Sequence, residues 1–176
     1  MAVRPVLKMG TPRLRQVAAP VQRFDAELTA LVADMNDTMR ALHGAGLAAP
    51  QIGVSLRVVI FEVTSNPRYP DVAPIPYTVL VNPELTPLGD EQEEGWEGCL
   101  SVPGLRGLVP RYKRLRYRGC DIEGAPIDRT VAGFHARVVQ HEVDHLDGIL
   151  YPQRMRDLRN FGFEDALIGQ MRPMPD

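Results

Sequence analysis

Residues 134–148 read Phe-His-Ala-Arg-Val-Val-Gln-His-Glu-Val-Asp-His-Leu-Asp-Gly, and the rest of the chain has to be arranged around this stretch. Apolar residues recur at helical spacing in Phe134, Val138 and Leu146, a pattern that predicts an amphipathic helix. Thr130 is of a type that caps helix starts, and Gly148 is of the type that ends helices. The pattern therefore predicts a helix between these two residues.

His141 and His145 stand four residues apart within this predicted helix. Side chains at this spacing lie one above the other on a helix face, so both imidazoles can reach one metal ion. Glu142 lies at the rim of the same face, where its carboxylate can act as a base. The pattern favours a metal site on the helix, and two solvated histidines on a surface helix are the plain alternative.

A third ligand has to come from elsewhere in the chain. Catalytic zinc sites usually have three protein ligands and keep one position open for water. In common zinc proteases the third ligand is a downstream His or Glu, but no histidine follows His145, and Glu164 is the only later glutamate. Cys99, in Glu97-Gly98-Cys99-Leu100-Ser101, is a stronger candidate because a thiolate is a soft ligand and the glycine allows close backbone approach. A lone cysteine is more often a small buried hydrophobe, which is the interpretation that suits Cys120.

A stretch of small residues, Gly44-Ala45-Gly46-Leu47-Ala48-Ala49-Pro50-Gln51, forms the third candidate motif. Glycines such as Gly46 let the main chain come close to another group, and Gln51 supplies a neutral amide with two donors. By itself, such a stretch indicates only a turn after a helix.

Composition limits the class of protein. The chain has 176 residues, 44% of them hydrophobic and 24% charged, which is typical of a globular protein and favours one domain over residues 1–176. The net charge of −2 argues against binding nucleic acid through bulk charge, so we expect no specific DNA partner. Two cysteines cannot form a disulfide framework and fit a reducing compartment. Without a signal-peptide pattern or an apolar run of the ~20 residues that cross a bilayer, we expect a cytoplasmic protein and no membrane segment.

The other segments predict an α+β fold. An apolar stripe from Leu28 to Leu42 predicts a helix with Asp25 as its N-cap and Gly44 at its end. Runs of β-branched residues at 56–63 and 77–81 predict buried strands, and apolar residues alternate with basic ones around Leu115 and Tyr117.

Weaker signals complete this interpretation. A short strand is expected at 127–129, the acidic residues 90–94 are expected in a solvated loop, and a short helix is expected near 164–168. The prolines between and after the first two strands predict a surface loop with short strands, at Pro67, Pro70, Pro74, Pro76, Pro83 and Pro87.

Together, the three motifs resemble those of the peptide deformylase family. In chain order they are Gly44-x-Gly-Leu-Ala-Ala-x-Gln51, Glu97-Gly-Cys-Leu-Ser101 and Gln140-His-Glu-x-x-His-Leu-x-Gly148. The resemblance spans most of the chain, as far as about Tyr151. We therefore expect short, mainly antiparallel β-sheets packed around a central helix that carries the His-Glu-x-x-His motif.

The resemblance also implies an activity. Family members are metal-dependent hydrolases that remove the formyl group from the N-formylmethionine at the start of nascent polypeptides, releasing formate. The implied ligands are Cys99, His141 and His145, with water in the fourth position. Iron(II) is the usual metal of the family, and zinc, nickel or cobalt can substitute for it.

The residues suit this chemistry. Glu142 can take a proton from water and pass it to the departing nitrogen. The family's donors to the developing oxyanion are the side-chain amide of Gln51 and the backbone N–H of Leu100. Arg111 is expected to pair with Glu97.

Four residues are expected to bind the substrate. Phe134 and Val138 precede His141 on the predicted helix and are candidates for the apolar methionine pocket. Gly46 is expected to let the backbone approach the bound peptide. Arg106 follows the cysteine motif, where the family carries an arginine near the peptide.

Other functions remain open on sequence alone. The chain could be a His-Glu-x-x-His metalloprotease that cuts internal peptide bonds, although that leaves Cys99 unexplained. It could also be a non-catalytic module with a structural Cys/His2 metal site, which would need a fourth protein ligand. The expected partners are N-formylmethionyl nascent peptides. The basic face formed by Arg114, Arg116 and Arg118 has two interpretations. It could make transient contact with the ribosome, or it could simply be a strand face exposed to solvent.

Overall fold

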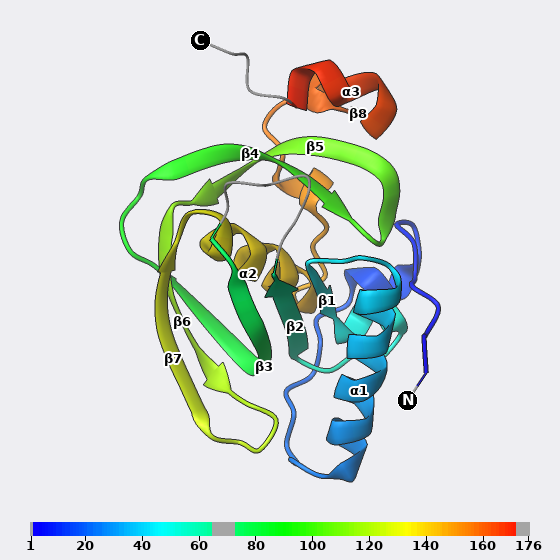
Figure 1. Ribbon diagram of the computed structural model, residues 1–176, viewed down its shortest axis with the longest axis vertical. Helices are drawn as coiled ribbons and strands as arrows, with labels where there is room; N and C mark the ends of the chain where they lie inside the picture. The colour runs from blue at the N-terminus through cyan, green and yellow to red at the C-terminus, as the bar shows by residue number, and fades with distance from the viewer. Residues whose placement is uncertain (1, 65–72, 172–176) are drawn as a thin grey trace.

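The computed structural model describes residues 2–64 and 73–171 (Figure 1). Eight strands and three α-helices are joined by short 3-10 helices within these residues. The helices are α1 (Ala26–Ala41), α2 (Gly133–Leu146) and α3 (Glu164–Met171). The strands are β1 (Gly46–Ala48), β2 (Val58–Val63), β3 (Ile75–Pro87), β4 (Gln92–Cys99), β5 (Val102–Tyr112), β6 (Arg114–Cys120), β7 (Pro126–Ala132) and β8 (Phe161–Phe163).

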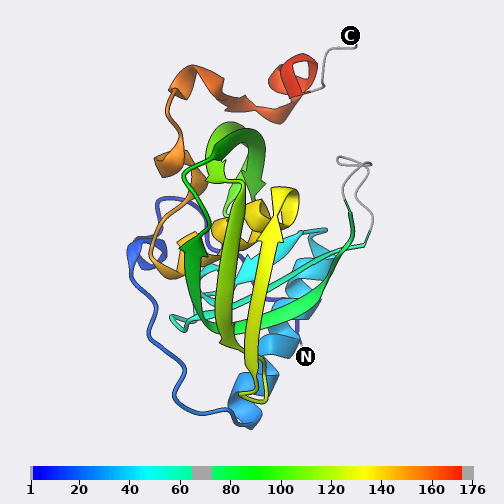
Figure 2. The ribbon, with the colours of Figure 1, turned by 90° about the vertical axis from the view of Figure 1, so that its left-hand side faces the viewer.

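The strands form two antiparallel sheets. The larger has the order β1-β2-β3-β6-β7, and the smaller has the order β4-β5-β8. Helix α2 lies at the centre of Figure 1, with β6 and β7 on one side and β4 and β5 above it, and Figure 2 shows the larger sheet curving past it. The expected α+β fold, with antiparallel sheets around a central helix that carries the histidine motif, is confirmed.

Strand β2 is buried on both faces because helices cover both sides of the larger sheet. Val59 and Phe61 belong to the apolar cluster that includes α2 residues, whereas Val58 and Ile60 belong to the cluster that includes α1 residues. This explains why the segment reads as a continuous apolar run rather than an alternating one. The packing of Val59 and Phe61 against α2 also holds that helix on the sheet.

Helix α1 begins where the sequence predicts. The carboxylate of Asp25 accepts hydrogen bonds from the backbone N–H groups of Glu27 and Leu28, at 3.0 and 3.2 Å. The helix ends at Ala41, three residues before the predicted end at Gly44. His43 has a φ of +53°, so the chain has already left the helix there.

The predicted start of α2 is wrong. Thr130 belongs to β7 and pairs with Arg116, so its backbone is part of the sheet and cannot cap a helix. The helix starts at Gly133, whose φ of +59° makes the sharp turn from strand to helix. Helix α3 starts within the segment expected to be helical and continues to Met171.

The proline-rich region is also more regular than predicted. Residues 75–87 form one 13-residue strand, β3, and not a loop with short strands. Pro76 and Pro83 fall where the pairing of β3 with its neighbours shifts register, so their missing N–H groups remove no ladder hydrogen bond. Pro67 and Pro70 lie outside the described residues.

Strands β4 and β5 have no counterpart in the sequence-based expectations. They form a hairpin in which Cys99 pairs with Val102 across a tight turn. Of the acidic residues expected in a loop, Asp90 and Glu91 precede β4, whereas Glu93 and Glu94 are exposed residues of that strand. The basic face predicted for β6 is present, but Arg116 pairs with Asp128 and Arg118 with Glu84. Within the described residues, no helix is long and apolar enough to cross a membrane.

Candidate metal centre and active site

The structure brings Cys99, His141 and His145 together at the end of β4 and on one face of α2. Their potential ligand atoms lie within 4.8 Å of one another, and Cys99 Sγ is 3.4 Å from His145 Nε2. The two imidazole rings stand nearly perpendicular, with centroids 5.0 Å apart. Helical spacing aligns the histidines, and the β4–β5 turn places the cysteine opposite them.

The donor set fits a transition-metal ion. One thiolate and two imidazoles are ligands that zinc and iron(II) both accept. Burial lowers the pKa of His145 well below its usual value, which favours the neutral imidazole that a metal requires. Among the described residues, no further His, Cys, Asp or Glu joins this group. The group therefore matches a catalytic site with an open position better than a closed structural site.

Glu97 orients the first histidine. Its Oε2 lies 2.8 Å from His141 Nδ1, and because an ionised carboxylate can only accept, the contact favours a proton on Nδ1 and leaves Nε2 for the metal. Burial by itself raises the pKa of Glu97, but hydrogen bonds from His141 and Arg111 outweigh it and hold the pKa well below the usual value. Tyr151 stacks on the His141 ring, with centroids 6.1 Å apart.

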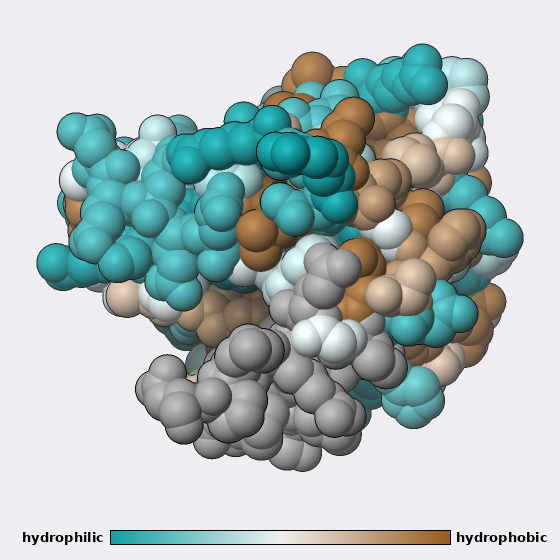
Figure 3. All heavy atoms as spheres, turned by 90° about the horizontal axis from the view of Figure 1, so that it is seen from above, coloured by the Kyte–Doolittle hydropathy of each residue, from teal (hydrophilic) through white to brown (hydrophobic). Residues whose placement is uncertain are grey.

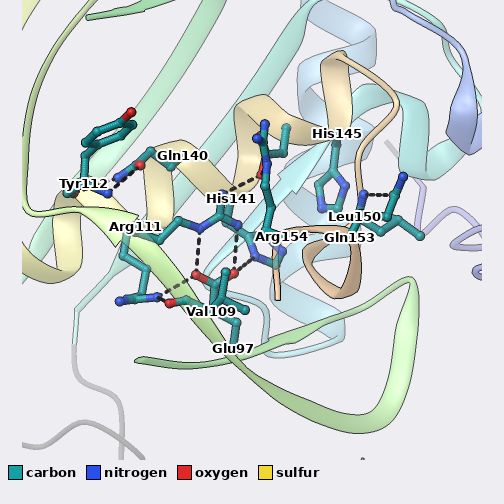
Figure 4. Close-up of polar contacts among 12 residues, drawn as sticks. Glu97, Val109, Arg111, Tyr112, Gln140, His141, His145, Leu150, Gln153 and Arg154 are labelled. Carbon is teal, nitrogen blue, oxygen red and sulfur yellow. Dashed lines mark hydrogen bonds and ion pairs between the residues drawn. The ribbon is translucent and has the colours of Figure 1, made fainter. Parts of the chain in front are cut away.

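A buried ion-pair network surrounds Glu97 (Figure 4). Arg111 donates to both carboxylate oxygens of Glu97 at 2.9 Å, as expected, and to Asp144 Oδ2 at 2.5 Å. Arg137 donates to Glu97 Oε1 at 2.9 Å, and Arg154 donates to Asp144 Oδ1 at 2.7 Å. These contacts join β4, β5 and α2 directly behind His141.

Sequence reasoning missed Arg137, Asp144 and Arg154. Arg137, His141 and Asp144 follow one another at four- and three-residue steps, which places them on one face of α2. That spacing was a usable signal, because buried charges on the face of a metal ligand need partners. Arg154 carries no comparable signal in the sequence.

Glu142 is the candidate base of the site. Its side chain is buried, and Oε2 has no hydrogen-bond partner among the described residues. Burial raises the pKa of Glu142 to about 7, the effect of nearby charges being smaller. A Cβ at Gly46 would overlap this carboxylate, which explains why glycine stands there. Gly46 therefore makes room for the candidate base as well as lining the cavity.

Gln51 is held beside the candidate metal ligands by the short helix at Ala49–Ile52. Its Oε1 accepts from the backbone N–H of Ala48 at 2.8 Å, which fixes the orientation of the amide. Its Nε2 lies 3.1 Å from Ser101 Oγ and 3.4 Å from Cys99 Sγ. The amide donor thus points toward the candidate metal centre.

A cavity of about 380 Å³ connects these groups, within the range of small-ligand sites. It is formed by the segment before β1, the β4–β5 turn, α2 and the start of α3. The sequence-predicted residues that line it are Gly46, Gln51, Cys99, Leu100, Arg106, Phe134, Val138, His141 and Glu142. His145 is not one of the lining residues, but it belongs to the same candidate ligand group as Cys99 and His141.

Comparisons with known proteins agree with this architecture. The profile of the family described as polypeptide deformylase matches residues 3–161. Peptide deformylase 1 of Nitrosomonas europaea is 68% identical over 94% of this chain and 95% of its own length. Peptide deformylase 2 of Ralstonia nicotianae is 64% identical over 96% of each chain.

Solved structures give the same result. A Met-Ala-Ser-bound class I type b peptide deformylase from Acinetobacter baumannii superposes with a TM-score of 0.84 and 42% identity, covering 88% of this chain and 99% of that one. A Legionella pneumophila peptide deformylase covers 98% of this chain and 100% of its own, with a TM-score of 0.78 and 36% identity. A metalloprotease of the common type and a purely structural metal module are both set aside, and the chain belongs to the peptide deformylase family.

Proposed function

We propose that the cavity binds the formylmethionyl end of a nascent polypeptide and that the site hydrolyses its formamide bond. The products are formate and a free α-amine. The observation that carries this proposal is the meeting of a Cys/His2 ligand group, a buried carboxylate and an oriented amide in one cavity. The Acinetobacter structure, solved with Met-Ala-Ser bound, supports a peptide that begins with methionine.

Cys99, His141 and His145 are proposed to hold one divalent metal ion, iron(II) in the native enzyme and zinc, nickel or cobalt as substitutes. When bound, such an ion lowers the pKa of water toward ~7 and polarises a carbonyl oxygen. Glu97 keeps His141 in the orientation and protonation state needed for binding. The network of Arg111 and Arg137 keeps Glu97 ionised and in place.

Glu142 is proposed to be the general base and then the general acid. Its Oε2, to which none of residues 2–64 and 73–171 donates a hydrogen bond, accepts the proton of the attacking water, and the protonated carboxyl then donates to the departing nitrogen. A carboxyl with a pKa of about 7 can do both near neutral pH. Because Gly46 has no side chain, the Glu142 carboxylate keeps its place and the formyl group of the substrate can come close to it.

Gln51 and Leu100 are proposed to stabilise the charge that develops on the formyl oxygen. The Gln51 N–H that faces Cys99 is the donor directed toward the reacting group. The backbone N–H of Leu100, in the β4–β5 turn, is the second donor. A neutral amide suits this role, since a carboxylate would repel the oxyanion.

Phe134 and Val138 are proposed to form the apolar pocket for the methionine side chain. Both line the cavity from α2, seven and three residues before His141. Arg106 lines the cavity from β5 and is proposed to lie near the rest of the peptide. Together with Gly46 they leave room for an extended chain that enters with its N-terminus toward Cys99.

The proposed setting is the cytoplasm, where formylated nascent chains arise, with the whole chain acting as one catalytic domain. Ribosome contact through the face of β6 is a further part of this proposal. On that face Arg116 and Arg118 each pair with a carboxylate, whereas Arg114 forms no ion pair among the described residues.

The decisive experiment measures hydrolysis of formyl-Met-Ala-Ser by protein purified without oxygen, together with its metal content. We expect formate release in proportion to about one metal ion per chain, with iron as the predominant metal. A blocked internal peptide serves as the control and should stay uncut. Cleavage of the control peptide without release of formate would contradict the proposed function.

A further inference from the structure

Residues 2–15 lie beside α1 and reach the turn between β4 and β5, at the right of Figure 1, where they are drawn in blue. The backbone N–H of Arg4 donates to Thr38 Oγ1 at 2.9 Å, and Val6 packs against the apolar cluster that includes α1 residues. These contacts anchor the start of the segment on the helix. The next residues, 7–9, extend from this anchor to the candidate site.

The segment is not part of the cavity wall. Strands β4 and β5 and helix α3 carry lining residues and lie on the side of the molecule shown in Figure 3, where hydrophilic residues at the left meet hydrophobic ones in the centre and at the right. Of residues 2–15, none lines the cavity. Any influence of this segment on the reaction therefore passes through the residues that it holds.

Two backbone N–H groups connect the segment to the site. The N–H of Leu7 donates to the backbone carbonyl of Gln51 at 2.8 Å, and the N–H of Met9 donates to the backbone carbonyl of Ser101 at 2.7 Å. Gln51 carries one of the proposed oxyanion donors, and Ser101 directly follows Leu100, whose N–H is the other. One short stretch of chain thus holds together the two segments from which the donors come.

Ser101 links these groups on the side of the metal ligands. Its Oγ lies 3.1 Å from Gln51 Nε2, and its backbone N–H donates to Cys99 Sγ at 3.4 Å. Ser101 is fully buried, so its carbonyl relies on Met9 and not on solvent. A shift of Ser101 would therefore move the Leu100 N–H and turn the Gln51 amide at the same time.

A tight turn sets the direction of the Met9 N–H. The N–H of Thr11 donates to the carbonyl of Lys8 at 3.0 Å, Met9 has a negative φ, and Gly10 has a φ of +104°. This is the pattern of a type II turn, in which Met9 takes the second position, one that suits proline. The Met9 side chain is 48% exposed, so the backbone of the turn aims the N–H at Ser101.

From these contacts we propose that the backbone N–H of Met9 is a positioning group for catalysis. By holding Ser101 in place, it keeps the Leu100 N–H and the Gln51 amide directed at one point, where the oxyanion forms. The proposal rests on the proposed function, which names these two groups as the oxyanion donors. Residues 7–9 therefore serve the reaction from outside the cavity, without contact with the peptide.

The expected effect is on kcat and not on substrate binding. Loss of a whole oxyanion donor lowers kcat by about 10²–10³-fold. Donors that are displaced but still present keep part of their effect, so loss of the Met9 N–H should lower kcat by about tenfold. Because the donors act on charge that develops only in the transition state, kcat and kcat/KM should fall by the same factor.

The test is Met9→Pro, which removes the N–H and fits the second position of the turn. Met9→Ala is the matched control, since it shortens the same side chain and keeps the N–H. With formyl-Met-Ala-Ser, Met9→Pro should lower kcat per bound metal ion by about tenfold with KM and metal affinity unchanged, and Met9→Ala should match the wild type. In a Gln51→Ala background the loss caused by Met9→Pro should be smaller, because one of the two positioned donors is already absent.

Three results would overturn the proposal. They are wild-type kcat in Met9→Pro, the same loss in Met9→Ala, and a loss in Met9→Pro that is explained by lower metal content or is equally large in the Gln51→Ala background. If Met9→Pro does not fold, Gly10→Ala decides, because a Cβ there meets no atom within 4 Å and strains only the turn. We expect a smaller loss of kcat in that variant, and wild-type kcat would overturn the proposal.

The failure of this proposal is distinguishable from the failure of the proposed function. The wild-type enzyme alone tests the latter, since absence of formate release from formyl-Met-Ala-Ser would contradict the proposed function whatever the variants do. The role of Met9 is tested by ratios of variant to wild-type kcat, which require an active wild-type enzyme.

Discussion

The two sheets bury different kinds of residue. The five-stranded sheet buries apolar side chains, among them Phe61, Leu80 and Tyr117. The smaller sheet buries Val102 and Val109 but also the charged groups of Glu97 and Arg111, and Ser101 is buried in the turn between β4 and β5. Because buried ion pairs are costly to desolvate and contribute little net stability, the smaller sheet is organised for the site rather than for the core. The larger sheet thus provides most of the apolar core, and the smaller sheet holds the charged groups of the candidate site.

Helix α2 joins the two regions. Val139, Val143 and Leu146 pack in the apolar cluster of the larger sheet. The opposite side of the helix presents His141 and its charged neighbours to β4 and β5. Substitutions on either side of α2 should therefore have separable effects on activity and on stability.

The largest effect is expected at the base. Glu142→Ala should lower kcat by about 10²–10⁴-fold, because it removes the proton-transfer group and no metal ligand. Metal content should stay at the wild-type level, since Glu142 is not part of the Cys/His2 group. Steady-state kinetics with formyl-Met-Ala-Ser and metal analysis of the same samples test both points. A variant that keeps more than a tenth of wild-type kcat would contradict the role given to Glu142.

The next effect concerns the buried charges of the smaller sheet. Arg111→Leu should destabilise the protein by about 3–5 kcal/mol, because Glu97 and Asp144 lose a buried partner. Urea unfolding of the metal-loaded enzyme measures this change. Arg116→Gln is the control in the larger sheet, where the ion pair with Asp128 is exposed, and it should leave the urea midpoint unchanged within error. Equal shifts in the two variants would remove the distinction between the sheets.

The same contrast explains which parts of the fold could be predicted. The apolar run of β2 and the alternation around Leu115 and Tyr117 follow from burial against the core, and both strands are present. Strands β4 and β5 bury Glu97 and Arg111 and contain glycines and prolines, so no simple apolar period marks them. A strand whose inward side chains serve a site loses the pattern by which strands are recognised.

The candidate site divides in a similar way. His141, Glu142 and His145 are fixed by spacing within one helix, so the sequence places them relative to one another. The position of Cys99 opposite these residues depends on the register of β4 and β5. Residue spacing alone does not determine that register, so Cys99 was predicted as a ligand from the family resemblance. The contact between Arg106 and Glu164 depends on the pairing of β8 with β5, for which neither source gave a signal.

The two cysteines allow a more selective comparison. Cys99→Ser should weaken metal binding by at least about tenfold. Removing a residue that only supports a metal ligand already costs about 10–100-fold in affinity, and a ligand should matter no less. Cys120→Ser should leave metal affinity unchanged, because Cys120 packs beside the apolar cluster around α1. Metal titration with a competing chelator measures both affinities. The same metal affinity in the two variants would show that Cys99 is a packed side chain and not a ligand.

The smallest effect is expected in the larger sheet, on its face toward α1. Ile60 is fully buried in β2, between β1 and β3, and packs in the cluster that includes Met35 and Met39. Ile60→Val removes one methylene and should lower the free energy of unfolding by about 0.5–1.5 kcal/mol. It should not change kcat, because Ile60 is on the opposite face of β2 from the α2 cluster and does not line the cavity. Urea unfolding and kinetics on one preparation test both expectations, and a loss of kcat with unchanged stability would show that the larger sheet also tunes the site.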